Sequence, residues 1–343
     1  MILTIIIAFF SLIALIILHE LGHFVLAKSF GVKVEEFGLG YPPRIFGKKI
    51  RGTIYSLNFL PFGGFVKIYG QEKTIKNPRS FSEKPFWQKA IIILAGVISF
   101  WFVAAILLSI VMAIGAPTIV EDEEDGSLVE PKVQIISISS GSSAEEAGLK
   151  MGDIIKNFDK VKEVQEFTKA HKGQEIVLTI QRGKEIFDVS LIAPMGVALA
   201  RTTLKSYPWY QAPLNGILAT GQLTWLIIKS WGMVFSSLFQ GQGMPAGVEI
   251  GGPVRIFELF VDVGNLGVSY FLQFIAFISI SLALINVLPI PALDGGWLLF
   301  MIISRLRKKP LNQEVVRKVS TAFFFLLVGL MIWITVKDIM NFF

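Results

Sequence analysis

The residues best able to do chemistry stand near the start of the chain, in the pattern His19-Glu20-Leu21-Gly22-His23. Side chains four residues apart lie on one face of a helix, so His19 and His23 could bind the same metal ion. Glu20 would then lie close to a metal-bound water molecule and could accept its proton. The pattern also arises by chance in unrelated proteins, so it predicts a metal site only together with its surroundings.

The composition limits the possible ligands of such a site. The 343 residues include no cysteine and three histidines, of which the third is His171. Any metal site must therefore use His, Asp or Glu. Zinc suits two imidazole nitrogens and a carboxylate, with a fourth position open for water. We expect His171 to lie on a solvated surface and not at a metal.

The chain is 53% hydrophobic and only 17% charged, whereas about a quarter of the residues of an ordinary soluble protein are charged. Four stretches are apolar over enough residues to cross ~30 Å of hydrocarbon. They are residues 2–18, 91–116, 270–303 and 320–336. The first has no basic start and no small-residue cleavage site, so we interpret it as a retained span. The sequence thus predicts an α-helical polytopic membrane protein with four transmembrane helices.

The distribution of charge predicts the orientation. Residues 28–89 contain twelve Lys or Arg and four Asp or Glu, and the short loop 305–318 is also basic. Both should lie in the cytoplasm of the cell, inside its inner (plasma) membrane. Residues 117–269, which include the acidic run 121–125, should lie outside. Residues 214–239 are apolar but contain Lys229 and would upset this arrangement as a fifth span, so we predict an interfacial helix on the outer surface.

The motif stands in the first apolar stretch, where ionisable side chains are costly. A plain alternative is a polar patch that packs on another helix or reaches the membrane interface. The third stretch carries the sequence NVLPIPALDGG from Asn286 to Gly296. Its two prolines and two glycines predict a broken helix, which at membrane depth must line a cavity. Asp294 is the one ionisable residue there, either a third metal ligand or a structural hydrogen-bond partner.

Residues 131–194 have the pattern of a small soluble α+β module, in which strands alternate with a short helix. Arg182-Gly183 stands between two alternating strands and predicts a hairpin. The segment from Ala147 to Asp153 reads AGLKMGD, and with its flanking strands it resembles a circularly permuted bacterial PDZ domain. PDZ domains bind an extended peptide or a C-terminus as an added strand. The alternative is a generic β-rich domain without a ligand.

The two chemical motifs together resemble the site-2 protease family of intramembrane metalloproteases. HELGH in the first span and NVLPIPALDGG in a late span are joined, in family order, by FGLGYPPR, YSLNFLPFGGFVK, FWQKAIIILAG and GGPV. This fuller pattern resembles the bacterial regulator-of-sigma-E protease branch. One departure is at residues 95–100, where AGVISF lacks the proline and asparagine that are common in the family.

The resemblance implies a function and a set of site residues. It implies Zn2+ on His19, His23 and Asp294, with Glu20 as the catalytic residue that activates water in a site open toward the cytoplasm. Asn286 is available to hydrogen-bond a substrate carbonyl or the oxyanion. The implied substrates are single-span membrane proteins in the lipid bilayer, such as anti-sigma factors or remnant signal peptides, and no nucleic acid is expected.

A β-hairpin is predicted between the first two spans. Residues 54–59 and 65–69 are strand-like and flank the turn signal PFGG at 61–64. The resemblance implies that this hairpin dips into the membrane, where its edge could hold an unwound substrate segment as an added strand. The candidate substrate-binding residues are Gly63, Gly64, Phe65, Val66 and Lys67. The alternative is an ordinary cytoplasmic hairpin packed on the first span.

The predicted organisation has four parts: a first membrane part (1–116), the PDZ-like domain (131–194), an outer linker with the interfacial helix (195–269) and a second membrane part (270–343). The first hypothesis is a zinc-dependent intramembrane endopeptidase that performs regulated intramembrane proteolysis. The alternatives are a metal-ion transporter, since some carry HExxH in a span, and an inactive PDZ membrane receptor.

Overall fold

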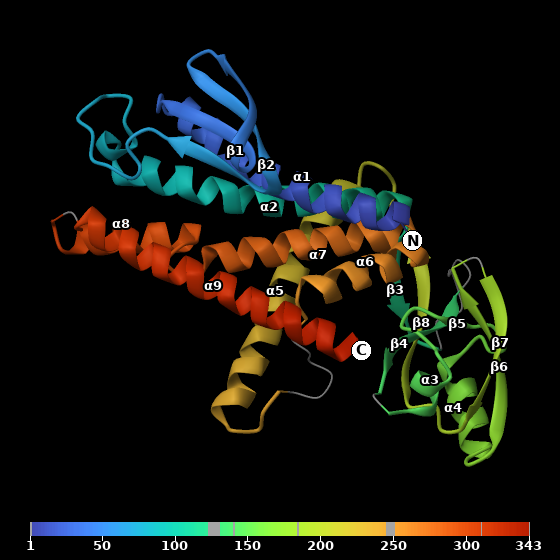
Figure 1. Ribbon diagram of the computed structural model, residues 1–343. Helices are drawn as coiled ribbons and strands as arrows, with labels where there is room; N and C mark the ends of the chain where they lie inside the picture. Colours follow the sequence, from blue (N-terminus) through green and yellow to red (C-terminus); the bar gives the residue numbers. More distant parts are fainter. Residues whose placement is uncertain are drawn as a thin grey trace.

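Apolar helices form the body of the protein, and two β-sheets flank it (Figure 1). The computed structural model describes residues 2–122, 131–139, 141–183, 185–244, 251–309 and 311–342. The predicted acidic run 121–125 therefore lies partly outside the described residues. In the described part, four helices are long and apolar enough to cross a membrane: Thr4–Ser29, Phe86–Ile114, Val268–Val287 and Gln313–Met340. This number agrees with the sequence prediction.

These four spans belong to helices α1 (Ile2–Ser29), α2 (Phe86–Ile114), α7 (Val268–Val287) and α9 (Gln313–Phe342). The third predicted apolar stretch, 270–303, is divided into two helices. It consists of α7 and a separate helix α8 (Asp294–Leu306), because two prolines interrupt the helical hydrogen bonds between them. The break itself falls where the sequence predicts it.

Helix α2 is the centre of the bundle and contacts α1, α5, α7 and α8. Small residues allow these close contacts. A Cβ on Gly22 of α1 would lie 2.5 Å from the Ala95 carbonyl oxygen of α2. A Cβ on Gly216 of α5 (Ala212–Phe239) would lie 2.5 Å from the Ser109 nitrogen of α2. The helix predicted at 214–239 is thus present and packs on α2, while its interfacial location stays a prediction.

The predicted turn of the β-hairpin is wrong. Strands β1 (Val34–Ile50) and β2 (Thr53–Ile68) are joined at Arg51-Gly52, whose φ angles of 47° and 85° suit a tight two-residue turn. The segments on either side of the predicted PFGG turn do not pair with each other. Both pair with β1, so that Phe37 lies opposite Tyr55 on one side and Val66 on the other. Residues 64–68 consequently form an edge of this sheet.

The module predicted at 131–194 contains a six-stranded sheet in the order β3-β8-β4-β5-β6-β7. Its elements are β3 (Ala116–Val120), β4 (Lys132–Ile138), α3 (Ser143–Glu146), β5 (Ile154–Ile155), α4 (Val161–Ala170), β6 (Glu175–Arg182), β7 (Glu185–Ile192) and β8 (Val197–Lys205). β6 and β7 form the hairpin predicted from Arg182-Gly183, with Arg182 opposite Glu185. The module core includes Val133, Ile135, Ile155, Leu178 and Ile180. The sheet extends past residues 131–194, because β3 and β8 belong to it.

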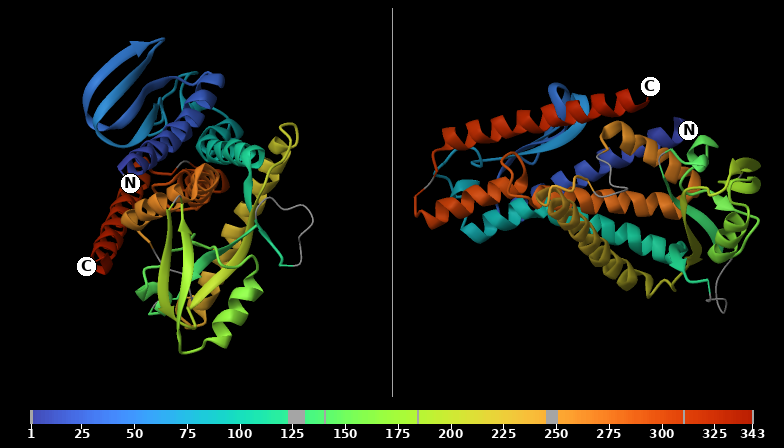
Figure 2. Two further views of the ribbon diagram at one scale, coloured as in Figure 1. Left: turned by 90° about the vertical axis from the view of Figure 1, so that its right-hand side faces the viewer. Right: turned by 90° about the horizontal axis from the view of Figure 1, so that it is seen from below.

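The β1–β2 sheet and the module lie at opposite ends of the helical bundle (Figures 1 and 2). A short helix α6 (Pro253–Leu266) lies beside the module and packs on α1, α7 and α9. Its start is held by Asp338 of α9, whose carboxylate accepts hydrogen bonds from the Gly252 nitrogen at 2.8 Å and the Arg255 nitrogen at 3.3 Å. α6 therefore links the module to the membrane helices.

Candidate active site

The two histidines of the HELGH motif converge as their helical spacing predicts. α1 places both on the face that packs against α2, where His23 is 8% exposed. Their Nε2 atoms lie 3.3 Å apart. His19 stands about ten residues before the end of α1, which is about 15 Å along the helix axis. His23 stands six residues before the end, about 9 Å along the axis, so both histidines lie within the apolar helix.

Asp294 reaches this pair from the other end of the chain. It is the first residue of α8, directly after the break that follows α7. Its Oδ2 lies 3.4 Å from Nε2 of His19 and 3.3 Å from Nε2 of His23. The break is tight, because a Cβ on Gly295 would clash with the Val287 carbonyl oxygen. The glycine that follows Asp294 is thus needed to bring its carboxylate to the histidines.

This cluster fits a metal ion. Within the described residues, one group of three side chains could bind a metal ion: His19, His23 and Asp294. Their donor atoms all lie within 4.8 Å of one another. Two donors bound to one tetrahedral zinc at ~2.0–2.1 Å lie about 3.3–3.4 Å apart, which matches the observed spacings. Oδ2 of Asp294 is buried and has no hydrogen-bond partner in the described part. A cation at the centre would satisfy it.

Helix α2 holds the two imidazole rings. Nδ1 of His23 lies 2.8 Å from the Ile92 carbonyl oxygen. Since a carbonyl only accepts, Nδ1 donates and Nε2 keeps its lone pair for a metal. His19 stacks on Phe100, with ring centroids 4.7 Å apart and planes at 23°. A Cβ on Gly96 would clash with Nε2 of His23 and lie 2.5 Å from Cε1 of His19. Position 96 of α2 must therefore have no side chain.

Glu20 stands apart from the three donors and faces the β1–β2 sheet. A Cβ on Gly64 would lie 3.3 Å from Cγ of Glu20, and the Val66 backbone N–H lies near the Glu20 carboxylate. The edge segment 64–68 of β2 thus runs past Glu20 of α1. An acidic group next to the metal position, but not within it, is placed to accept a proton from water.

The predicted substrate-binding residues lie in two places, strand β2 and the end of helix α7. Gly63, Gly64, Phe65, Val66 and Lys67 lie in β2, with Phe65 stacked on Tyr41 at 6.4 Å and Lys67 3.5 Å from Glu35. Asn286 donates from Nδ2 to the Leu282 carbonyl oxygen of its own helix at 2.9 Å. Its role toward a substrate stays a prediction.

Sequence reasoning missed the contributions of Ile92 and Phe100, and it did not interpret Gly96 as a packing requirement. A backbone carbonyl carries no sequence signal. The AG pair at 95–96 was a signal that could have been used, because small residues in a span mark a close helix contact. His171 lies outside the site, at the end of α4, with Nδ1 2.9 Å from the Phe167 carbonyl oxygen.

An apolar helical bundle that encloses two histidines, an aspartate and an adjacent glutamate is typical of a membrane metallohydrolase. The chain belongs to peptidase family M50, the site-2 proteases, whose family model matches residues 7–330. "Putative zinc metalloprotease CPE1693" of Clostridium perfringens is 32% identical over 343 residues, covering 98% of each chain. "Putative zinc metalloprotease CA_C1796" of Clostridium acetobutylicum is 33% identical over 348 residues, covering 98% of this chain and 97% of its own.

A third relative, "Regulator of sigma-W protease RasP" of Bacillus subtilis, is 26% identical over 417 residues and covers 93% of this chain and 94% of its own. The family membership identifies a membrane zinc metalloprotease of the site-2 type. It favours the endopeptidase over the two alternatives, a metal-ion transporter and an inactive PDZ receptor.

Proposed function

We propose that the chain cleaves single-span membrane proteins within the bilayer, with zinc held by His19, His23 and Asp294 and with Glu20 as the general base. The observation that carries the proposal is the approach of Asp294 Oδ2 to within 3.4 Å of both Nε2 atoms. Zinc bound there would polarise the scissile carbonyl and lower the pKa of a bound water molecule.

The chain's own residues supply the remaining steps. The Glu20 carboxylate accepts the proton of the attacking water and can return it to the leaving amine. The Ile92 carbonyl fixes the ring of His23, and Phe100 fixes that of His19. The close packing of α1 on α2 at Gly22 and Gly96 fixes the positions of the two imidazole rings relative to α2.

A transmembrane substrate must first be unwound, because a helix hides its amides in internal hydrogen bonds. The edge segment 64–68 pairs with β1 on one side and runs beside Glu20, and an unwound substrate could add to its other side as a strand. Residues 63–67 would then hold the cleavage site close to the metal. Support comes from the contact of Gly64 and Val66 with Glu20.

We further propose that the site opens toward the cytoplasm of a bacterial cell and that the module, a PDZ-like domain, lies outside the plasma membrane. The charge distribution supports this orientation, since 28–89 and 305–318 are basic. Anti-sigma factors and remnant signal peptides are the substrate classes that fit. The module would filter substrates by the size of their outer domains.

One experiment tests the core of this proposal. The purified protein is mixed with a labelled single-span substrate, with and without a zinc chelator. We expect cleavage that stops with the chelator and returns with added zinc. Cleavage that persists after complete zinc removal would refute the assignment of His19, His23 and Asp294.

A further inference from the structure

The two imidazole rings of the site are held in different ways. Nδ1 of His23 donates to the Ile92 carbonyl oxygen at 2.8 Å. Nδ1 of His19 is buried and has no hydrogen-bond partner in the described part of the chain. Within these residues no hydrogen bond at Nδ1 sets the direction of the His19 ring, so another contact must do so.

That contact is the aromatic ring of Phe100 on α2. Its centroid lies 4.7 Å from that of the His19 ring, with the two planes at 23°, so the rings are stacked. Phe100 is 3% exposed and belongs to a buried apolar cluster that includes Leu15, Val97 and Ala283. An imidazole bound to a metal through Nε2 is electron-poor and is attracted to the negative face of a phenyl ring. The stack therefore favours the orientation of His19 that metal binding needs.

A hydroxyl group of α7 fixes the backbone that carries this ring. Ser279 is fully buried, and its Oγ donates to the Phe100 carbonyl oxygen at 2.8 Å. A serine within a helix often turns its hydroxyl group back to the carbonyl four residues earlier, as Ser281 of the same helix does toward Phe277. Ser279 instead bonds to a different helix. The Phe100 carbonyl oxygen has two lone pairs, so it can accept this bond in addition to one within its own helix.

Helix α7 also determines the position of the third metal-ligand candidate. It ends at Val287, eight residues or about 12 Å along the axis from Ser279. The break that follows leads into Asp294, and it is tight because a Cβ on Gly295 would clash with the Val287 carbonyl oxygen. One helix therefore sets the Asp294 carboxylate through the break and holds, through Ser279, the residue on which His19 stacks.

We propose that Ser279 is a positioning residue of the metal site: it holds Phe100 so that the His19 ring presents Nε2 to the metal position. The inference rests on the proposed zinc site and adds to it a residue of α7 that is not itself a ligand. As a consequence, zinc affinity depends on the packing of α7 against α2 as well as on the donors. A movement of α7 relative to α2 would weaken the bonds of His19 and Asp294 to the metal together.

The test measures zinc affinity by competition with a chelator. It uses the full-length protein in detergent with Glu20→Gln, so that metal binding is measured without turnover. Ser279→Ala removes the hydroxyl group, and Ser281→Ala is the matched control because its hydroxyl group bonds within α7. Phe100→Leu removes the flat ring but keeps an apolar side chain. Phe102→Leu is its control, since Phe102 is 66% exposed on the same helix.

We expect Phe100→Leu to weaken zinc binding about ten-fold, the lower end of the effect of groups that orient metal ligands. Ser279→Ala should weaken it about three-fold, the usual effect of losing a hydrogen bond between membrane helices. Added to Phe100→Leu, Ser279→Ala should cause little further loss, because changes that act through one contact do not add. Both changes should alter the visible spectrum of cobalt bound in place of zinc, which reports ligand geometry. Both controls should leave affinity and spectrum unchanged.

Three results would overturn the inference, and they separate it from the proposed function. A purely structural role of Ser279 would lower the unfolding temperature of the zinc-free protein without changing its zinc affinity. Full and independent effects of Ser279→Ala and Phe100→Leu in the double variant would show that Ser279 does not act through the ring. Zinc affinity that His19→Ala leaves unchanged would refute the proposed site itself, and the role of Ser279 with it.

Discussion

Nε2 of His19 lies 3.4 Å from Oδ2 of Asp294, although the two residues stand near opposite ends of the chain. The contact exists because α8 begins at Asp294 and packs on α2, which also packs on α1. The metal position therefore depends on both membrane parts at once. A change in either part should alter metal content as well as activity.

The first prediction separates the ligands from the base. His19→Ala, His23→Ala and Asp294→Ala should lose both zinc and proteolysis, because each removes a donor of a three-donor site. Glu20→Gln should retain zinc and lose activity by about 100-fold or more, the typical contribution of a general base. Zinc analysis beside a cleavage assay measures both. An active Glu20→Gln protein would be incompatible with the proposed mechanism.

The second prediction concerns the bare backbone of α2. Gly96→Ala should lower zinc affinity and stability, by about 1–3 kcal/mol for the strain of overpacking, because the new Cβ would clash with His23. Gly329→Ala in α9 is the matched control, since nothing lies within 4 Å of its Cβ position. Thermal unfolding and zinc titration provide the measurements. Normal zinc binding by Gly96→Ala would show that α1 and α2 are less tightly fixed than these distances require.

The sequence predicted the parts of the site that depend on local rules. His19 and His23 follow from helical spacing, and the break before Asp294 follows from its prolines and glycines. The hairpin turn was predicted wrongly because PFGG was given more weight than Arg51-Gly52, whose positive φ angles close the real turn. The pairing of β3 with β8 could not be predicted, since no local pattern encodes which distant strands meet.

The third prediction tests the edge strand beside Glu20. Val66→Pro removes one backbone N–H, the edge donor that lies near Glu20. It should reduce cleavage of a helical substrate strongly and reduce cleavage of a substrate loosened by Gly or Pro much less. Lys48→Pro, in the opposite edge of the same sheet, is the control for general damage. Equal losses for both substrates with Val66→Pro would indicate a packing role instead.

The fourth prediction concerns orientation, and the absence of cysteine makes it simple to test. Lys76→Cys and Lys309→Cys should react with a membrane-impermeant thiol reagent only after cell lysis. Lys172→Cys, on the module, should react in intact cells. Labelling of the Lys309 variant from outside would mean that α5 crosses the membrane as a fifth span.

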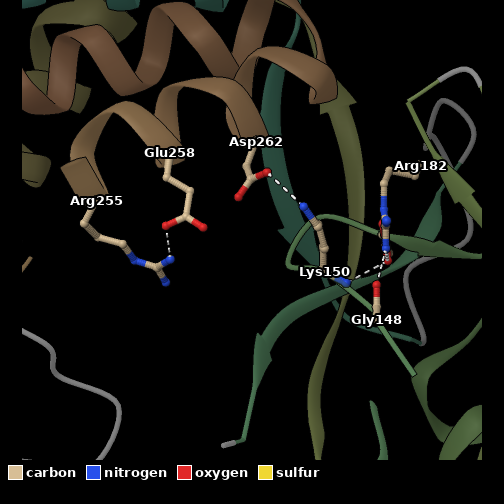
Figure 3. A network of polar contacts seen from close by, with 7 residues as sticks. Gly148, Lys150, Arg182, Arg255, Glu258 and Asp262 are labelled. Atoms are coloured by element: carbon tan, nitrogen blue, oxygen red, sulfur yellow. Dashed lines mark hydrogen bonds and ion pairs between the residues drawn. The ribbon is translucent and has the colours of Figure 1, made fainter. Parts of the chain in front are cut away.

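The last prediction concerns the docking of the module on α6 (Figure 3). Lys150 Nζ lies 3.9 Å from Oδ1 of Asp262, and a Cβ on Gly152 would lie 2.5 Å from Cδ2 of Leu266. Burial raises the pKa of the Asp262 carboxyl, while Lys150 opposes this shift. The cost of burying the charge therefore offsets much of the attraction, and Lys150 is itself largely exposed. The apolar contact of Leu266 should contribute more to docking than the ion pair, which at such a site is worth about 0–1 kcal/mol.

If a docked module filters substrates, loosening it should relax discrimination without stopping the reaction. Leu266→Ala should raise the cleavage rate of a substrate with an intact outer domain and leave that of a pre-trimmed substrate largely unchanged. Lys150→Glu should have a smaller effect in the same direction, and Lys150→Glu combined with Asp262→Lys should restore it. The comparison is of the two cleavage rates in each variant at equal zinc content. If Leu266→Ala stops cleavage of the trimmed substrate while zinc remains bound, the docked module is required for the reaction itself, and the filter hypothesis is wrong.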